Sequence, residues 1–309
     1  MLPKTTLPDE HVFAGVELGG TKAIAVVWRE GGIIDRFIVP TQEPQKTLAT
    51  LGDWLAGHPL QPAFAGLGIA SFGPIRLDPG AVDYGHILAT PKPGWAGTPV
   101  AATLAGRVAC PTVLDTDVNA AALAEYRWGA GQGCSSLIYL TIGTGVGGGI
   151  VIDGRPVHGA LHPELGHLRL RRAAGDAFAG ICPFHGDCIE GLIAGPALAA
   201  RFAGGIHATV ADDPCRDHLA ADLAQLLTAL ILTLAPQKIL VGGGVGLGVP
   251  GLLDAAIAKV PAILNGYLPQ FDASALQTTI TPPGLGADAG PLGAIALAQS
   301  IAPASEPRG

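Results

Sequence analysis

Two stretches of the chain place apolar, strand-forming residues on both sides of a short turn rich in glycine and threonine. Residues 12–27 are VFAGVELGGTKAIAVV, and residues 137–152 are LIYLTIGTGVGGGIVI. Runs of β-branched and apolar residues around a glycine turn predict a β-hairpin in each place. We interpret the two as the opening hairpins of two related α/β domains, although two unrelated buried hairpins would give the same pattern.

After each hairpin, apolar strands alternate with helices rich in alanine and leucine, a pattern typical of mixed or parallel sheets covered by helices. The predicted strands are 65–70, 112–115 and 238–241, and the predicted helices are 119–126, 194–202, 219–234 and 289–301. We expect an N-terminal α/β lobe over 1–117 and a C-terminal α/β lobe over 118–288. The helix 289–301 should pack back on the first lobe, and the tail 302–309 should be disordered.

Composition excludes several classes of protein. Apolar residues make up 49% of the 309 positions and charged residues 14%, so the chain is globular. The net charge of −7, with no cluster of lysine and arginine, argues against a nucleic-acid surface. The start lacks a secretory apolar core, and the longest apolar run, within Leu226–Ala235, is too short to cross a membrane. We therefore expect a cytoplasmic protein without a membrane partner.

Three glycine clusters are candidates for contact with a nucleotide. The first turn does not have the spacing of a Walker loop, but its glycines let backbone N–H groups approach a phosphate. The second is denser in glycine, and each glycine in a strand costs roughly 0.5–1 kcal/mol against alanine, which favours phosphate contact over a plain turn. The third follows a strand and could accept adenine, or be an ordinary turn. The residues are Gly19, Gly20, Thr21, Lys22; Thr144, Gly145; and Gly242, Gly243, Gly244.

The sequence Leu114–Asn119 should end a strand and begin a helix. Asp117 or Asn119 could simply cap that helix, which is the ordinary role of such residues at this position. Asp117 could instead be a general base at the domain junction, within reach of a substrate hydroxyl. The spacing alone does not separate the two interpretations.

A group of four residues has the composition of a zinc site. His167, Cys182, His185 and Cys188 lie within 22 positions and could bind one tetrahedral ion. Two thiols and two surface histidines are the alternative. The segment 168–181 between them carries three arginines and two glycines and can bury little apolar surface by itself. A metal joining its two ends would fix the shape of this loop.

In this order and spacing the motifs resemble the ROK family of bacterial sugar kinases. The resemblance covers roughly Ala14 to Ala298 and rests on ELGGTK, TDVNAAALAE, LTIGTGVGGG, HPELGH, the Cys/His cluster and GADAGPLGAIALA. It implies an actin-like (ribonuclease H-like) ATPase fold of two lobes with the active site in the cleft between them. It also suggests a homodimer that binds ATP, Mg²⁺, a structural Zn²⁺ and a sugar.

The same resemblance implies a role for each matching residue. Asp117 matches the catalytic base. The two glycine turns match the phosphate loops, and Gly242–Gly244 match the adenosine loop. The residues that correspond to sugar contacts are Glu164, His167, Glu190, Thr116 and Lys92.

The sequence departs from the usual family pattern in three places, and the third bears on which sugar is the substrate. Glu17 stands where many members have aspartate, and Thr116 replaces the usual asparagine before the base. The glucokinase signature C-x-C-G-x2-G-C is absent, whereas CPFHGDC, HPELGH and TPKPGW (90–95) resemble the fructokinase branch. The expected reaction is therefore phosphorylation of fructose to fructose 6-phosphate, with mannose, glucose or an N-acetylhexosamine as alternatives.

Two other kinds of protein compete with a kinase. A sugar-responsive ROK regulator would carry a helix-turn-helix before the first hairpin, but only about a dozen residues precede it here. A sugar-binding protein that has lost catalysis would not need Asp117 and both phosphate loops. An assay of ADP release across hexoses would separate these possibilities.

Overall fold

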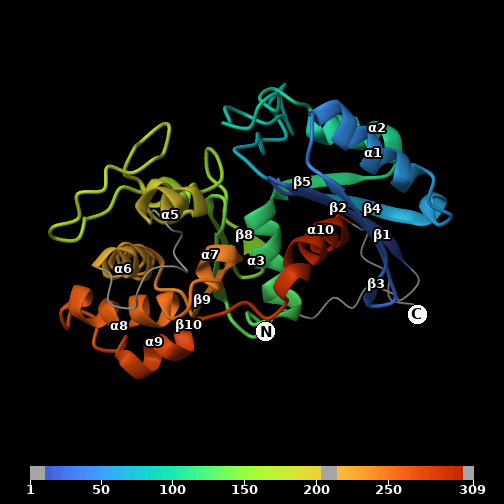
Figure 1. The fold of residues 1–309 in the computed structure, drawn as a ribbon. Coiled ribbons are helices and arrows are strands. Elements are labelled where there is room, and N and C mark those ends of the chain that lie inside the picture. The colour runs from blue at the N-terminus through green and yellow to red at the C-terminus, as the bar shows by residue number, and fades with distance from the viewer. Residues whose placement is uncertain (1–10, 203–213, 302–309) are drawn as a thin grey trace. The chain divides into compact units, whose positions relative to one another are not determined.

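The computed structural model describes residues 11–202 and 214–301, and the chain forms two compact units (Figure 1). Unit 1 comprises Met1–Arg127, Pro156–His162 and Ala287–Gly309. Unit 2 comprises Trp128–Arg155 and Pro163–Gly286. The expected disordered tail, 302–309, lies outside the described residues.

Unit 1 is built on a mixed five-stranded sheet with the order β3-β2-β1-β4-β5. The first hairpin supplies its antiparallel part, and β4 and β5 continue it in parallel with β1. The strands are β1 (Val12–Leu18), β2 (Lys22–Arg29), β3 (Gly32–Pro40), β4 (Phe64–Ser71) and β5 (Thr112–Thr116). The predicted hairpin and both predicted strands of this region are confirmed.

Alternating residues of the unit 1 sheet face different helices. Val12, Ala14, Val16 and Leu18 share one core with α1 (Pro44–Ala56) and α2 (Val100–Val108). On the other face, α10 (Ala289–Ser300) lies so close to β4 that a Cβ at Gly68 would overlap the carbonyl of Ala294. The predicted last helix thus packs on the sheet of unit 1. The helix α3 (Asp117–Trp128) follows β5 directly.

Unit 2 repeats the plan with a second five-stranded sheet of the order β10-β9-β6-β7-β8. The second hairpin, β6 with β7, is antiparallel, and β9 runs parallel to β6. The strands are β6 (Ser136–Ile142), β7 (Val146–Ile152), β8 (Arg155–Pro156), β9 (Lys238–Gly242) and β10 (Ile280–Thr281). The second predicted hairpin and the strand predicted at 238–241 are therefore confirmed.

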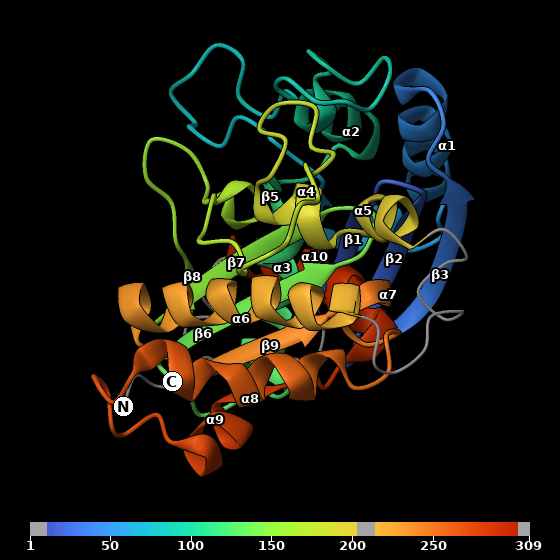
Figure 2. The same cartoon turned by 60° about the vertical axis from the view of Figure 1, so that its left-hand side comes forward.

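The longest helix of unit 2, α6 (Pro214–Leu234), is a core helix that packs beside α8 (Leu252–Leu264) (Figure 2). By length and composition its Cys215–Leu234 segment could cross a membrane, but 56% of its most apolar window is buried within the protein. The other short helices of the described residues belong to both units. In unit 1 there is η1 (Gln61–Ala63). The others are α4 (Ile189–Ile193), α5 (Gly195–Arg201), α7 (Gly243–Gly246), α9 (Ala273–Thr279), η2 (Leu165–His167) and η4 (Gly286–Asp288).

Candidate functional site

Asp117 is the first residue of α3, at the point where β5 ends. The neighbouring Thr116 caps this helix, because its Oγ1 accepts a hydrogen bond from the N–H of Asn119 at 3.1 Å. Asp117 Oδ1 accepts a hydrogen bond from the adjacent N–H of Val118, at 2.9 Å, and not from the N–H groups further along the helix that a capping side chain binds. Helix capping therefore does not account for Asp117.

Glu17 at the end of β1 and Asp117 form a pair of carboxyl groups with raised pKa values. Burial raises the pKa of Asp117 to about 6. Burial, followed by the negative charge of Asp117, raises the pKa of Glu17 to about 7, although Lys22 and Arg36 act in the opposite direction. Glu17 therefore binds a proton more readily than Asp117 as the pH falls. Such a pair can accept a proton or share a cation.

A polar cluster at the end of β5, which the sequence did not reveal, joins the buried Asp115 and Asn119 to the exposed His158. Asp115 Oδ2 lies 2.9 Å from His158 Nε2, and Asp115 Oδ1 accepts a hydrogen bond from Asn119 Nδ2 at 2.8 Å. The hydrogen bond to Asp115 raises the pKa of His158 above its ordinary value. The cluster fixes the end of β5, but a lone histidine 43 positions downstream carries no signal of it.

The first glycine turn is open to solvent. Gly20, Thr21 and Lys22 are exposed, and a Cβ at Gly20 would meet no atom within 4 Å. Lys92 Nζ donates a hydrogen bond to the carbonyl of Gly20 at 2.5 Å and lies 5.9 Å from the centre of the Phe72 ring. The structure thus places Lys92, an expected sugar contact, beside the predicted phosphate turn.

The second glycine turn is packed against other parts of unit 2. Thr144 is exposed, but Val146 N–H donates to Glu190 Oε2 at 3.1 Å. A Cβ at Gly148 would overlap the side chain of Leu165. Packing therefore requires some of these glycines whether or not the turn contacts a phosphate.

The third glycine cluster, Gly242–Gly244, joins β9 to α7. Gly243 has φ +88°, and a Cβ there would overlap the backbone of Ile142. A Cβ at Gly244 would meet no atom within 4 Å. The backbone conformation and packing at position 243 therefore require glycine, whereas position 244 faces open space.

The HPELGH motif (162–167) comprises the short helix η2 and the three residues before it. Glu164 is exposed, and its carbonyl accepts a hydrogen bond from the N–H of His167 at 3.1 Å. Gly166 lies directly against the carbonyl of Val146, where a Cβ would overlap. This contact and that of Glu190 bring two segments with expected sugar ligands to the second glycine turn.

The four predicted metal ligands come together in unit 2, and their ligand atoms all lie within 4.8 Å of one another. They are His167, Cys182, His185 and Cys188. Cys182 Sγ lies 3.8 Å from His167 Nδ1 and 3.7 Å from His185 Nδ1, and Cys188 Sγ lies 3.6 Å from His167 Nδ1. Tetrahedral zinc with bonds of about 2.3 Å to sulfur and about 2.0–2.1 Å to nitrogen separates such atoms by about 3.6 Å. The donor set and its spacing fit a structural zinc.

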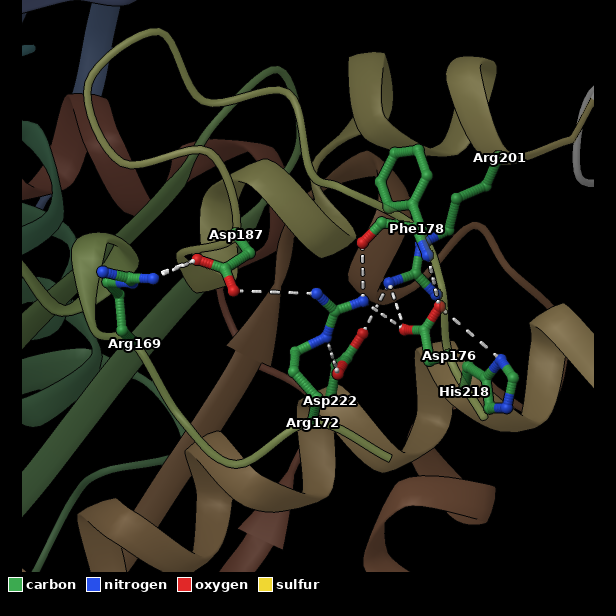
Figure 3. A network of polar contacts seen from close by, with 8 residues as sticks. All are labelled: Arg169, Arg172, Asp176, Phe178, Asp187, Arg201, His218 and Asp222. Atoms are coloured by element: carbon green, nitrogen blue, oxygen red, sulfur yellow. Dashed lines mark hydrogen bonds and ion pairs between the residues drawn. The ribbon is translucent and has the colours of Figure 1, made fainter. Parts of the chain in front are cut away.

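The loop between the metal ligands is also held by ion pairs, which the sequence analysis did not predict (Figure 3). Arg172 lies between Asp187 of the Cys/His cluster segment and two further carboxylates, Asp176 and Asp222. Arg201 joins the same two carboxylates at 3.1 and 2.8 Å. Charged side chains thus anchor this loop to α5 and α6.

The centre of this network is buried and balanced in charge. The side chains of Arg201 and Asp222 are each 2% exposed, and the Arg201 guanidinium lies 4.7 Å from the centre of the Phe178 ring. Burial raises the pKa of Asp222 despite the opposing charges of Arg201 and Arg172. For Asp176, burial acts to raise the pKa, but the hydrogen bonds from Arg172 and from the Phe178 N–H, together with the charges of Arg201 and Arg172, outweigh it, and the pKa is lowered.

Comparison with known proteins identifies the family. The sequence profile of the ROK family matches residues 13–301. This chain belongs to the ROK family. A fructokinase of Zymomonas mobilis is 38% identical, over 94% of this chain and 97% of its own length. The crystal structure of a ROK hexokinase from Thermus thermophilus has a TM-score of 0.75 and 29% identity, and covers 94% of this chain and 98% of its own.

A second ROK structure connects the fold with ligands. It is a ROK family glucokinase from Streptomyces griseus in complex with glucose and AMPPNP, with a TM-score of 0.69 and 26% identity over 94% of this chain and 99% of that one. The ROK chain described here is thus a sugar kinase with the expected actin-like fold, built on two mixed five-stranded sheets with helices.

Proposed function

We propose that this ROK kinase transfers the γ-phosphoryl group of MgATP to O6 of fructose. The observation that carries the choice of sugar is the 38% identity with a fructokinase over 94% of this chain, against 28% identity with a glucokinase over 77% of it. A pocket built to hydrogen-bond a particular hydroxyl can reject a substrate that lacks it by about 10⁴–10⁵, so a direct comparison of hexoses decides the sugar.

Unit 1 supplies the base in this proposal. Asp117 takes the proton of the sugar hydroxyl as that oxygen attacks the γ-phosphorus, and the bond from phosphorus to the bridging oxygen of ADP breaks. A pKa of about 6 keeps Asp117 ionised at neutral pH while leaving it a stronger base than an exposed aspartate. Thr116 holds the start of α3 and so fixes the direction of the Asp117 side chain.

Mg²⁺ would neutralise the charge that develops on the transferred phosphoryl group. Glu17 is the candidate to hold it, because the negative charge of Asp117 helps to keep the pKa of Glu17 at about 7 and a cation would relieve that repulsion. Lys22 and Lys92, both at the first glycine turn, add positive charge for the phosphates.

Unit 2 supplies the sugar ligands. Glu164 and Glu190 offer carboxylate oxygens to sugar hydroxyls, and His167 offers Nε2, since its Nδ1 faces the two thiols. Zinc at the Cys/His cluster would orient His167 and hold the loop, without taking part in the chemistry. The turn with Thr144 and Gly145 would bind phosphates, and Gly242–Gly244 would bind adenosine.

A coupled assay of ADP release tests the proposal. The purified enzyme is given MgATP with fructose, mannose, glucose or N-acetylhexosamines, and fructose should give the highest kcat/KM. The Asp117→Asn protein serves as the control for contaminating kinases. ADP release with another hexose at a higher kcat/KM would contradict fructose, and no release with any hexose would contradict the kinase assignment.

We further propose that the enzyme works as a homodimer in the cytoplasm. A Cys/His metal site and ATP as co-substrate suit a reducing compartment. Light scattering after size-exclusion chromatography should give twice the mass of one chain, and a monomer that is fully active would contradict the dimer.

A further inference from the structure

Glu190 contacts the second glycine turn directly. Its Oε2 accepts a hydrogen bond from the N–H of Val146 at 3.1 Å. Glu190 lies in the first turn of α4, two residues after Cys188 of the metal cluster. A carboxylate has two oxygens with about four acceptor positions, so the bond to Val146 leaves Oε1 for a sugar hydroxyl.

Gly145 provides the space that this contact needs. A Cβ at position 145 would lie 2.7 Å from Glu190 Oε2, closer than side chains pack in proteins. The φ angle of Gly145 is outside the left-handed region, so its backbone does not require glycine. The glycine at 145 is therefore explained by the carboxylate beside it.

The same turn is held at its other end. Gly195 N–H, at the start of α5, donates to the carbonyl of Gly143 at 2.7 Å. The segment from Glu190 to Gly195 thus contacts both ends of the Gly143–Val146 turn. A change in the position of α4 would move the backbone N–H groups of that turn.

We propose that Glu190 couples sugar binding to nucleotide binding, through its hydrogen bond to Val146 and the space left by Gly145. This inference rests on the proposed function, in which Glu190 binds the sugar and the turn binds phosphates. A sugar held by Oε1 restricts the carboxylate, and the carboxylate then restricts the turn in the arrangement that accepts nucleotide. Coupling of this kind is reciprocal: each ligand tightens the other by the same factor.

A purely structural role for Glu190 predicts a different result. If the side chain only supported the turn, its displacement would weaken nucleotide binding equally with and without sugar. Coupling predicts that the displacement removes the difference between the two conditions. The measurement is therefore a ratio of dissociation constants and not an activity.

Isothermal titration calorimetry with AMP-PNP and Mg²⁺, with and without saturating fructose, provides that ratio. In the wild-type protein fructose should tighten AMP-PNP by about 5–150-fold, and AMP-PNP should tighten fructose by the same factor. In Gly145→Ala the added methyl group displaces the carboxylate, and the factor should fall to about 1. Glu190→Asp, which is one methylene shorter, should do the same. Glu190→Gln keeps an acceptor oxygen at full reach and should retain more coupling than Glu190→Asp.

Gly143→Ala is the matched control, since its Cβ would come no closer than 3.9 Å to the nearest atom, the nitrogen of Gly244. It alters the same turn without touching Glu190, and its coupling factor should equal that of the wild type. If Gly145→Ala does not fold, Glu190→Asp carries the test. A wild-type factor near 1, or an unchanged factor in Gly145→Ala and Glu190→Asp, overturns the inference. An enzyme that phosphorylates fructose without coupling contradicts this inference alone and leaves the proposed function in place.

Discussion

The two hairpin turns of this protein have similar sequences but different surroundings. In unit 1, Gly20 faces open space, while Thr41 and Lys92 donate hydrogen bonds to the carbonyls of Gly19 and Gly20. In unit 2, Gly145 and Gly148 are confined by Glu190 and Leu165. The first turn has an exposed backbone at Gly20, whereas the second is packed against the segments that carry the expected sugar ligands.

This difference shows that glycine content has more than one cause. In an open turn, glycine lets a ligand approach the backbone closely. In a packed turn, glycine lets a neighbouring side chain approach the backbone closely. The chemical groups follow the same division. The two carboxyl groups with pKa values of about 6 and about 7 lie in unit 1, and the metal cluster and the ion network lie in unit 2. Substitutions in unit 1 should therefore affect chemistry, and those in unit 2 should affect stability and ligand placement.

The largest effect should come from Asp117→Asn in unit 1. Loss of a general base typically costs about 10²–10⁴ in rate, and the change should appear in kcat more than in the KM for fructose. In the wild type, kcat/KM should fall about tenfold per pH unit below pH 6, because protonated Asp117 cannot accept a proton. Wild-type kcat in the variant would place the base elsewhere.

The same variant should be more stable than the wild type above pH 6. Because folding raises the pKa of Asp117 from 3.8 to about 6, the unfolded chain ionises more readily, and stability falls as pH rises through that window. Asparagine removes this loss, so urea unfolding should show a gain at pH 8 and little difference at pH 3.5. A less stable variant at pH 8 would contradict the burial of a charged Asp117.

Removal of the metal should have the next largest effect, and it acts on unit 2. We expect about one zinc per chain, with activity lost on strong chelation and in Cys188→Ser. Without the metal, the loop that carries His167 and leads to Glu190 would lose the ion that joins its two ends. Cys134→Ser, a thiol of unit 2 outside the cluster, is the control and should keep both metal and activity. Full activity in zinc-free enzyme would disprove this role.

Arg201→Met tests whether ion pairs hold the same loop. Arg201→Met removes a positive charge that pairs with the buried carboxylates of Asp176 and Asp222. The free energy of unfolding should therefore fall by about 3–5 kcal/mol. Arg169→Met, at a site that is 67% exposed, should cost less than about 1 kcal/mol. The double variant Arg201→Met, Asp222→Leu should recover part of the loss. Equal stability of Arg201→Met and Arg169→Met would show that the network does not stabilise the loop.

The smallest effects should come from the two turns themselves. Gly148→Ala places a methyl group against Leu165, which should cost about 1–3 kcal/mol in urea unfolding. Gly20→Ala enters open space and should change stability by less than about 1 kcal/mol. It should instead raise the KM for ATP, because the methyl group obstructs phosphate. A larger loss of stability in Gly20→Ala than in Gly148→Ala would contradict the distinction between an open and a packed turn.

Sequence pattern by itself determined the two hairpins, the parallel strands that follow them, the last helix and the four metal ligands. These features are local: strand and turn signals extend over a few residues, and His167 to Cys188 spans only 22 positions. A short loop brings such ligands together, so their spacing is informative.

Only the tertiary structure decided which distant side chains meet. The contact of Lys92 with Gly20 spans 72 positions, that of Glu190 with Val146 spans 44, and that of Arg201 with Asp222 spans 21 across two helices. Glutamate, lysine and arginine look alike in sequence whether they are solvated or buried. Their partners are set by the packing of the sheets and helices that carry them, since a charge is buried only where an opposite charge or a donor is already held in place.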